Sequence, residues 1–152
     1  MLCMLAVMED LMYIATPRPI PQIQELTVAL KFGMASEPLT GALLRTLAAS
    51  RPGGRLLELG PGTGLATAWL LDGMDHTSTL TSVDNDSLVQ AVAMKCLGDD
   101  PQLQLINMNA IEFLGNQTSQ SFDLVFADAL PGKYEGLDLA LAVVKPGGVL
   151  RY

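Results

Sequence analysis

The sequence is poor in basic residues, and this shortage limits the partners that the protein can have. Nine Lys and Arg residues stand against sixteen Asp and Glu residues, which gives a formal net charge of −7 over 152 residues. Nucleic acids and anionic lipid surfaces both select basic protein surfaces, so neither is expected as a main partner. No apolar run reaches the roughly 20 residues that a membrane-spanning helix needs.

Cysteine and histidine are also scarce. Cys3 and Cys96 lie far apart and match no metal-binding spacing, so we expect two free thiols in a reducing compartment. The single histidine, His76, is expected to be a polar surface residue. Neither residue type therefore indicates a metal centre or a disulfide framework.

The N-terminal segment 1–8 is apolar, but it does not match a secretory signal peptide. No basic residue precedes Arg18, and Glu9 and Asp10 interrupt the apolar stretch. We therefore expect a cytoplasmic protein without a membrane segment. The first segment is expected to form a helix that packs on the body of the protein or on a second copy, which would make a homodimer.

Beyond a proline-rich connector containing Pro17, Pro19 and Pro21, short apolar runs alternate with helical periodicity. The predicted helices cover residues 23–32, 37–49, 65–71, 88–97, 111–114 and 134–144. The predicted strands cover residues 55–59, 79–83, 103–106, 122–127 and 149–150, with a turn at 146–148 before the last strand.

Strands that alternate with helices predict an α/β fold with a parallel sheet. Right-handed crossovers make this a doubly wound, Rossmann-like sheet with helices on both faces. We expect one domain over residues 1–152, with extra N-terminal helices in segment 1–50 and the core in 55–152. The chain ends at Tyr152 just after the fifth strand opens. The expected core is therefore truncated there, without its C-terminal strands.

A glycine-rich segment follows the first predicted strand and contains Gly60, Gly62 and Gly64. Ligands of open parallel sheets bind beyond the carboxyl ends of the strands, which is where this loop falls. Glycine permits a positive φ and a close approach of the backbone to a ligand. The loop is therefore predicted to cradle a nucleoside cofactor.

The spacing of this loop separates the candidate cofactors. A dinucleotide fingerprint has the spacing G-x-G-x-x-G, whereas this loop has G-x-G-x-G with Leu65 at the third-glycine position. The Gly-Lys-Ser/Thr of a nucleotide-triphosphate loop is absent. Glu58 would repel a pyrophosphate but suits a cationic ammonium group, such as that of a methionine moiety.

Three further polar residues follow the next predicted strands. Asp84 comes 24 residues after Gly60 and can accept hydrogen bonds from both hydroxyls of a ribose, although it is also a candidate helix cap. Asn109 follows the third strand, where it could reach an adenine edge. Asp128 follows the fourth strand, with catalytic and capping roles both open.

These segments together resemble the class I S-adenosylmethionine-dependent methyltransferases, and most of all the small-molecule O-methyltransferases of the catechol and caffeoyl-CoA type. The resemblance covers roughly residues 34–150. It is carried by segments 34–38, 58–64, 82–84, 109–110, 122–129 and 144–148. The resemblance implies that S-adenosylmethionine is the cofactor and that a hydroxyl of a small molecule accepts the methyl group.

The resemblance also implies roles for the matching residues. Glu58 and the three glycines would line the methionine and ribose, Asp84 would hold the ribose, and Asn109 and Ala110 would face the adenine. Met34 and Asn85 would add cofactor contacts, and Asp128 would lie near the methyl group. The acceptor could be activated by a divalent cation such as Mg²⁺ at Asp128, the only metal candidate, or by Lys133 as a base.

Two other functions remain open from the sequence. One is a cofactor-binding or assembly module without turnover, because further family metal ligands have no counterpart at Arg151 and Tyr152. The other is an aminopropyltransferase-like enzyme, although such enzymes tend to carry paired acids where this chain has Asp128 alone. A dehydrogenase is disfavoured by the loop spacing.

Overall fold

The structure is a computed structural model that describes residues 14–33, 36–129, 132 and 134–152. Within these residues, no helix has both the length and the apolar character needed to cross a bilayer. The predicted helix and homodimer contact of the first segment fall on residues 1–13, outside the described residues.

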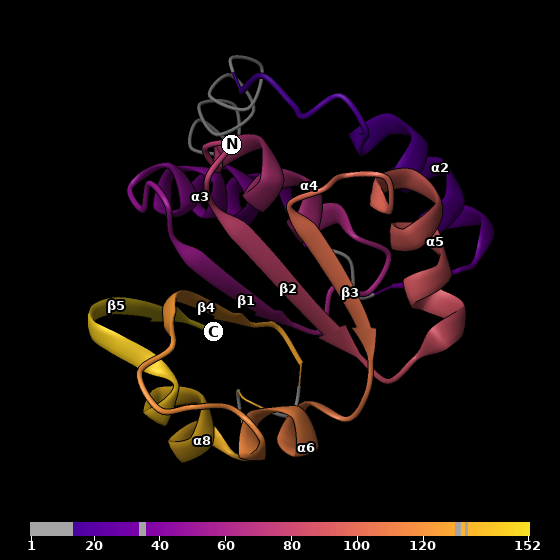
Figure 1. Cartoon of the computed structure of the whole chain (residues 1–152). Coiled ribbons are helices and arrows are strands. Elements are labelled where there is room, and N and C mark those ends of the chain that lie inside the picture. The colour runs from indigo at the N-terminus through magenta and orange to yellow at the C-terminus, as the bar shows by residue number, and fades with distance from the viewer. Residues whose placement is uncertain (1–13, 34–35, 130–131, 133) are drawn as a thin grey trace, which may run out of the picture.

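Five parallel strands form one sheet, as the alternating pattern predicts (Figure 1). Their order across the sheet is β3-β2-β1-β4-β5. Strands β1, β2 and β3 follow one another outward in one direction, and β4 and β5 extend in the other. The direction of winding therefore changes between β1 and β4. The strands are β1 (Arg55–Leu59), β2 (Thr79–Asp84), β3 (Leu103–Asn107), β4 (Phe122–Ala127) and β5 (Val144–Arg151).

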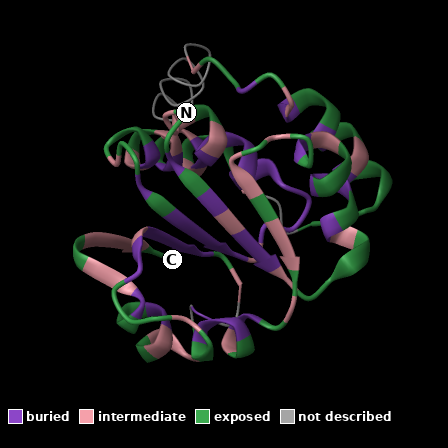
Figure 2. Ribbon diagram, viewed as in Figure 1, coloured by how far each residue is buried: buried purple, intermediate pink, exposed green. Residues whose placement is uncertain are grey.

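Helices cover both faces of the sheet, and the most buried residues lie between the layers (Figure 2). Helices α3 and α4 pack on the face that carries Leu56 and Leu80, and α6 and α8 pack on the face that carries Leu57 and Val83. Helices α2 and α5 join α4 in a third apolar cluster. The helices are α2 (Ile20–Ala29), α3 (Pro38–Ala49), α4 (Leu65–Gly73), α5 (Ser87–Leu97), α6 (Ala110–Gly115) and α8 (Leu137–Ala142).

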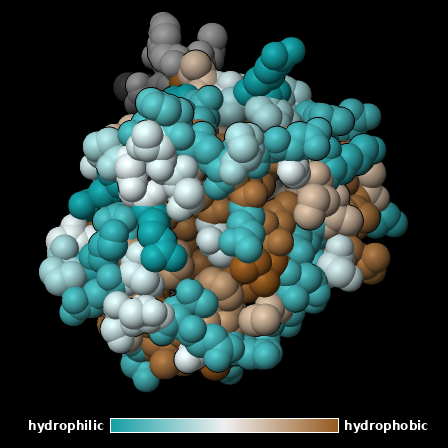
Figure 3. All heavy atoms as spheres, viewed as in Figure 1, coloured by the Kyte–Doolittle hydropathy of each residue, from teal (hydrophilic) through white to brown (hydrophobic). Residues whose placement is uncertain are grey.

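The distribution of hydrophobic and hydrophilic residues on the surface follows the same arrangement of layers. On the face drawn in Figure 3, hydrophobic residues gather in the middle, between helices whose outer surfaces are hydrophilic. Trp69 on α4 is buried, with the Arg45 guanidinium 4.8 Å from its ring centroid. His76 is exposed, as predicted.

The end of the chain differs from the prediction. The predicted helix 134–144 is shorter in the structure, where α8 covers only Leu137–Ala142. Gly136, with φ 69°, is the N-cap residue at which this helix begins. Strand β5 then begins at Val144, so the predicted turn at 146–148 was wrong as a boundary. The glycines instead form an irregularity inside the strand: two steps along β4, from Phe122 to Leu124, match five steps along β5.

The boundaries of α2 also differ from the prediction. The helix starts at Ile20 rather than residue 23, because Pro21 fits its first turn and does not belong to an extended connector. It ends at Ala29, three residues before the predicted end at residue 32. Lys31 adopts φ 53°, and Phe32 N–H donates to Thr27 O at 3.2 Å, which is the pattern of a Schellman motif. This ending fixes the direction of Phe32.

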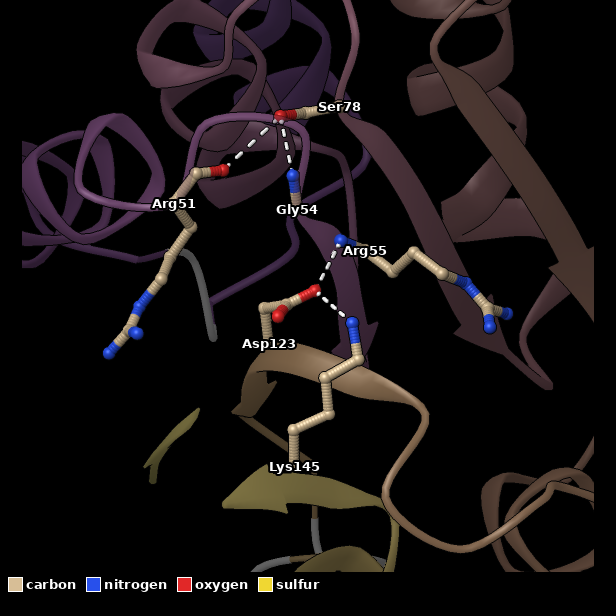
Figure 4. Close-up of polar contacts among 6 residues, drawn as sticks. All are labelled: Arg51, Gly54, Arg55, Ser78, Asp123 and Lys145. Atoms are coloured by element: carbon tan, nitrogen blue, oxygen red, sulfur yellow. Dashed lines mark hydrogen bonds and ion pairs between the residues drawn. The ribbon is translucent and has the colours of Figure 1, made fainter. Parts of the chain in front are cut away.

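At the amino ends of the strands, polar contacts join the first residues of β1, β4 and β5 (Figure 4). Asp123 Oδ2 accepts hydrogen bonds from Arg55 N–H and from Lys145 Nζ, both at 2.8 Å. Partial burial acts to raise the pKa of Asp123, but these donors outweigh it and lower the pKa below its ordinary value. Asp123 therefore ties three strands together as a carboxylate.

A second carboxylate fixes the turn before β2. Asp75 Oδ1 lies 2.8 Å from Ser78 Oγ and also accepts hydrogen bonds from the Thr77 and Ser78 backbone N–H groups. The Ser78 hydrogen bond is the largest of the effects that lower the pKa of Asp75. Ser78 Oγ also accepts a hydrogen bond from Gly54 N–H at 3.1 Å, which connects this turn to the start of β1 (Figure 4).

Candidate cofactor site

A cleft of about 590 Å³ opens beyond the carboxyl ends of β1, β2 and β4, at the point where the sheet changes its direction of winding. This is the position at which open parallel sheets bind ligands, and the volume suits a small molecule. The lining combines backbone of the glycine loop with polar and apolar side chains from several elements. It comprises Phe32, Ser36, Gly60, Pro61, Gly62, Thr63, Leu65, Val83, Asp84, Asn85, Asp86, Val89, Ala110, Asp128, Ala129 and Tyr134.

Two of the predicted glycines line the cleft in conformations that favour glycine. Gly60 has φ 83°, and a Cβ atom there would lie 2.7 Å from the Ala129 Cβ. Gly62 has φ 54°, and a Cβ atom there would lie 3.0 Å from the Phe32 ring. Any side chain at these positions would be strained and would crowd the wall of the cleft. The loop thus presents its backbone at close range.

Gly64 has a different place. It precedes α4 with φ 96°, and a Cβ atom there would lie 2.9 Å from the Ala93 Cβ on α5. It is not among the residues that line the cleft. The absence of a side chain at Gly64 allows α4 to pack closely against α5. The structure thus gives Gly64 a packing role and does not place it in the cleft, where the cofactor contact was predicted.

Glu58 lies beneath the glycine loop rather than in the lining. Its side chain on β1 is fully buried, and Oε2 accepts hydrogen bonds from Thr67 Oγ1 at 2.7 Å and Ser82 Oγ at 2.5 Å. Removal from water raises the pKa of Glu58 to about 7, against the effect of these two donors and with added repulsion from Asp128 and Asp84. Its other oxygen, Oε1, is buried without a hydrogen-bond partner.

Asp84 lines the cleft at the end of β2, and its carboxylate is held by two backbone groups. Oδ2 accepts from Gly62 N–H at 3.1 Å and Oδ1 accepts from Asp86 N–H at 2.9 Å. The cap of α5 is Asp86, which accepts from the N–H groups of residues 88 and 89, so Asp84 does not serve as that cap. Asn85 is exposed and also lines the cleft.

The predicted adenine residues divide between two positions. Ala110 lines the cleft at the first turn of α6. Asn109 is the N-cap of this helix, and its side-chain oxygen accepts from the N–H groups of Ile111 at 2.8 Å and Glu112 at 3.3 Å. Asn109 does not line the cleft. By capping α6, it fixes the start of this helix and thereby the position of Ala110.

Asp128 also lines the cleft, directly after β4. Ser36 Oγ donates to its Oδ2 at 3.2 Å, and its backbone N–H donates to Leu59 O at 3.0 Å. The other predicted catalytic residue, Lys133, and the predicted cofactor contact Met34 lie outside the described residues.

Several lining residues were not predicted from the sequence. Phe32 and Ser36 come from the connection between α2 and α3, and Val89 comes from α5. Tyr134, the first residue of the predicted helix 134–144, lies instead in a turn with 73% of its surface exposed. The Schellman motif at the end of α2 directs Phe32 toward the cleft, and it depends on Lys31 adopting φ 53°, a conformation that glycine adopts more readily.

The resulting cleft has an acidic side and a backbone side. Asp84, Asp86 and Asp128 provide negative charge, and the glycine loop provides close backbone contact. This combination suits a ligand with a positive charge and sugar hydroxyls better than a pyrophosphate. In the described part of the chain, no three His, Cys, Asp or Glu side chains gather in a way that could hold a metal ion.

A sequence profile described as a methyltransferase domain matches residues 57–151, which is more than half of the chain. Among curated proteins, the chain is 33% identical over 125 residues to a protein of Mycolicibacterium vanbaalenii provisionally named an O-methyltransferase. The match covers 76% of this chain and 54% of that protein. The chain thus spans about half the length of the curated relatives that it matches.

Solved structures share the fold. A protein of Corynebacterium glutamicum is 26% identical with a TM-score of 0.78, over 91% of this chain and 67% of that one. The O-methyltransferase TomG of Streptomyces achromogenes, solved in complex with S-adenosylmethionine, is 23% identical with a TM-score of 0.82. That match covers 95% of this chain and 68% of TomG.

Proposed function

The chain belongs to the class I S-adenosylmethionine-dependent methyltransferase family, and we propose that it binds S-adenosylmethionine in the cleft and transfers its methyl group to a hydroxyl of a small molecule. The observation that carries the proposal is the pairing of the glycine loop with Asp84 at the winding change of the sheet. Gly62 N–H holds Asp84 Oδ2 at 3.1 Å, so loop and carboxylate form one preorganised surface.

The residues present fit this cofactor in two respects. Gly60 and Gly62 adopt positive φ values that only glycine takes up readily, and the close neighbours of both residues leave no room for side chains, as a closely held ligand requires. Glu58 Oε1 is a buried acceptor without a partner just below the loop, and a buried group of this kind is costly unless something satisfies it. A water held between Oε1 and the ammonium group of the bound cofactor would supply the missing donor.

Each cleft residue then has a role in binding or orientation. Asp84 keeps free acceptor capacity on both carboxylate oxygens and would accept hydrogen bonds from the ribose hydroxyls. Ala110 and Asn85 would flank the adenine. Asp128 would lie near the acceptor, where its negative charge stabilises positive charge on the neighbouring ligand.

When bound, the cofactor supplies an electrophilic methyl group on a sulfonium ion. The chain has to align this group with the acceptor and exclude competing water, which is mainly a task of positioning. Asp128, held by Ser36 Oγ, is the described residue best placed to orient an acceptor hydroxyl. The names of the O-methyltransferase relatives support a hydroxyl acceptor.

Titration calorimetry tests this proposal. We expect S-adenosylmethionine and S-adenosylhomocysteine to bind the purified chain and NAD not to bind. Asp84→Asn should weaken adenosyl binding about tenfold by weakening its acceptor strength toward the ribose, whereas Asp100→Asn, away from the cleft, should not. Binding of NAD alone would refute the proposal. Adenosyl binding without methyl transfer to a panel of phenols, with and without Mg²⁺, would refute its catalytic part.

A further inference from the structure

Helix α2 lies outside the strand-loop-helix unit that forms the glycine loop, yet it contacts this loop at two places. The first contact is a hydrogen bond between hydroxyls: Thr27 Oγ1 on α2 and Thr63 Oγ1 in the loop are 2.8 Å apart. Thr27 Oγ1 also lies 2.7 Å from Ile23 O. A hydroxyl has one proton, so Thr27 donates to Ile23 O and accepts from Thr63.

Both threonines are buried, with 5% of Thr27 and 1% of Thr63 exposed. Water therefore cannot replace Thr27 as the acceptor for the Thr63 hydroxyl without a change in packing. A buried donor without an acceptor costs considerably more than a typical hydrogen bond contributes. The pair thus restricts the side chain of Thr63, and with it the loop between Gly62 and Gly64.

The second contact is made by Phe32, just beyond the end of α2. Its ring packs over Gly62, where an added Cβ atom would lie 3.0 Å and 3.1 Å from two ring carbons, and it lines the cleft. The Schellman motif at Lys31 sets this position through the bond from Phe32 N–H to Thr27 O. Thr27 therefore takes part in both contacts, through its hydroxyl and its carbonyl.

We infer that α2 is part of the cofactor site, with Thr27 as a positioning residue that acts through Thr63 and Phe32 as a wall that contacts the bound cofactor. This inference rests on the proposed function. In this arrangement α2 holds the glycine loop in the conformation in which Gly62 N–H binds Asp84. Cofactor affinity then depends on a helix that precedes the Rossmann-like core in the sequence.

Three variants test the positioning role. Thr27→Val preserves the shape of the side chain and removes the acceptor, Thr27→Ser keeps the hydroxyl, and Val28→Ala changes an exposed neighbour on the same helix. We expect Thr27→Val to weaken S-adenosylhomocysteine binding about tenfold in calorimetry, with wild-type affinity in the other two. Phe32→Ala should weaken binding to a similar degree, and Phe32→Leu should recover part of it.

Amide hydrogen exchange of the ligand-free protein separates positioning from general destabilisation. Thr27→Val should exchange faster at Gly62 and Gly64 than wild type, while amides in β1 and β4 keep their rates. If Thr27→Val and Phe32→Ala bind like Val28→Ala, or if exchange rises uniformly, the inference is overturned. If the wild-type chain itself binds no adenosyl ligand, the proposed function fails, and the loop exchange rates still decide the positioning role of Thr27.

Discussion

The two ends of the parallel sheet carry acidic residues in opposite electrostatic states. At the amino ends, Asp123 and Asp75 accept several hydrogen bonds each, and their pKa values are lowered. Beneath the carboxyl ends, Glu58 is removed from water, retains an oxygen without a partner, and has a pKa raised to about 7. Acidic residues therefore stabilise the folded state at the amino ends of the strands, whereas the ionised form of Glu58 destabilises it near the carboxyl ends.

This difference teaches where binding is to be expected. An acid with lowered pKa favours the folded state as a carboxylate, because its donors are part of the fold. A buried acid with a raised pKa destabilises the folded state when ionised, and such groups cluster at functional sites. The cleft with its glycine loop lies at the second kind of end.

The largest expected effect comes from filling the glycine loop. Gly60→Val places a branched side chain at φ 83° against Ala129, so cofactor binding should weaken roughly a hundredfold or more. Calorimetry with S-adenosylhomocysteine measures this effect. Gly115→Ala is the matched control, because a Cβ atom there meets no atom within 4 Å. Wild-type affinity in Gly60→Val would contradict the placement of the cofactor site at the carboxyl ends of the strands.

Glu58→Gln tests the electrostatic side of the comparison. The folded pKa of Glu58 lies above its ordinary value of 4.5, so the folded state keeps a proton that the unfolded state releases. Glu58 therefore lowers stability progressively as pH rises from about 4.5 to about 7. The variant should be more stable than wild type at pH 8.5, by up to roughly 3 kcal/mol, with little difference at pH 4.

Urea unfolding at several pH values measures this difference, and calorimetry measures the accompanying loss of cofactor affinity. A stability gain that does not depend on pH would contradict the assignment of a raised pKa. Retained affinity would contradict the proposed water-mediated link between Glu58 and the cofactor.

Asp123→Asn should have the opposite character at the amino end. The variant weakens the hydrogen bonds with Arg55 N–H and Lys145, so we expect a loss of about 1 kcal/mol in unfolding free energy at pH 7. The contribution of a carboxylate with lowered pKa disappears as pH falls below its ordinary value of 3.8, so the variant and wild type should converge there. Cofactor affinity should not change; a large loss would show that the two ends are coupled.

Much of the fold could be predicted because its signals are local. Strands β1 and β4 have the predicted bounds, since each is a short apolar run with clear turn residues on both sides. The β5 boundary was missed because Pro146, Gly147 and Gly148 normally indicate a turn, whereas pairing with β4 keeps them within the strand. Tertiary pairing overrode the local signal.

The site could be predicted only where residues follow the strand ends in order. Asp84, Ala110 and Asp128 meet in one cleft because the carboxyl ends of parallel strands share an edge. Glu58 precedes the first glycine of the loop by two positions. Because side chains alternate between the two faces of a strand, that of Glu58 lies on the face covered by α4, where it contacts Thr67 and does not enter the cleft. The contacts of Phe32 and Thr27 with the loop could not be found from the sequence, because they join residues 30 or more positions apart. Thr27 follows Ile23 by one helical turn, but this spacing indicates only a buried face and not the partner of that face.

The most direct test of the account is an amide chemical-shift map of the chain during titration with S-adenosylhomocysteine. The account predicts the largest shifts at Gly60, Gly62, Asp84, Asn85 and Ala110, with little change at Arg55, Ser78 and Asp123. Shifts concentrated at the amino ends of the strands, or no shifts at saturating ligand, would contradict it.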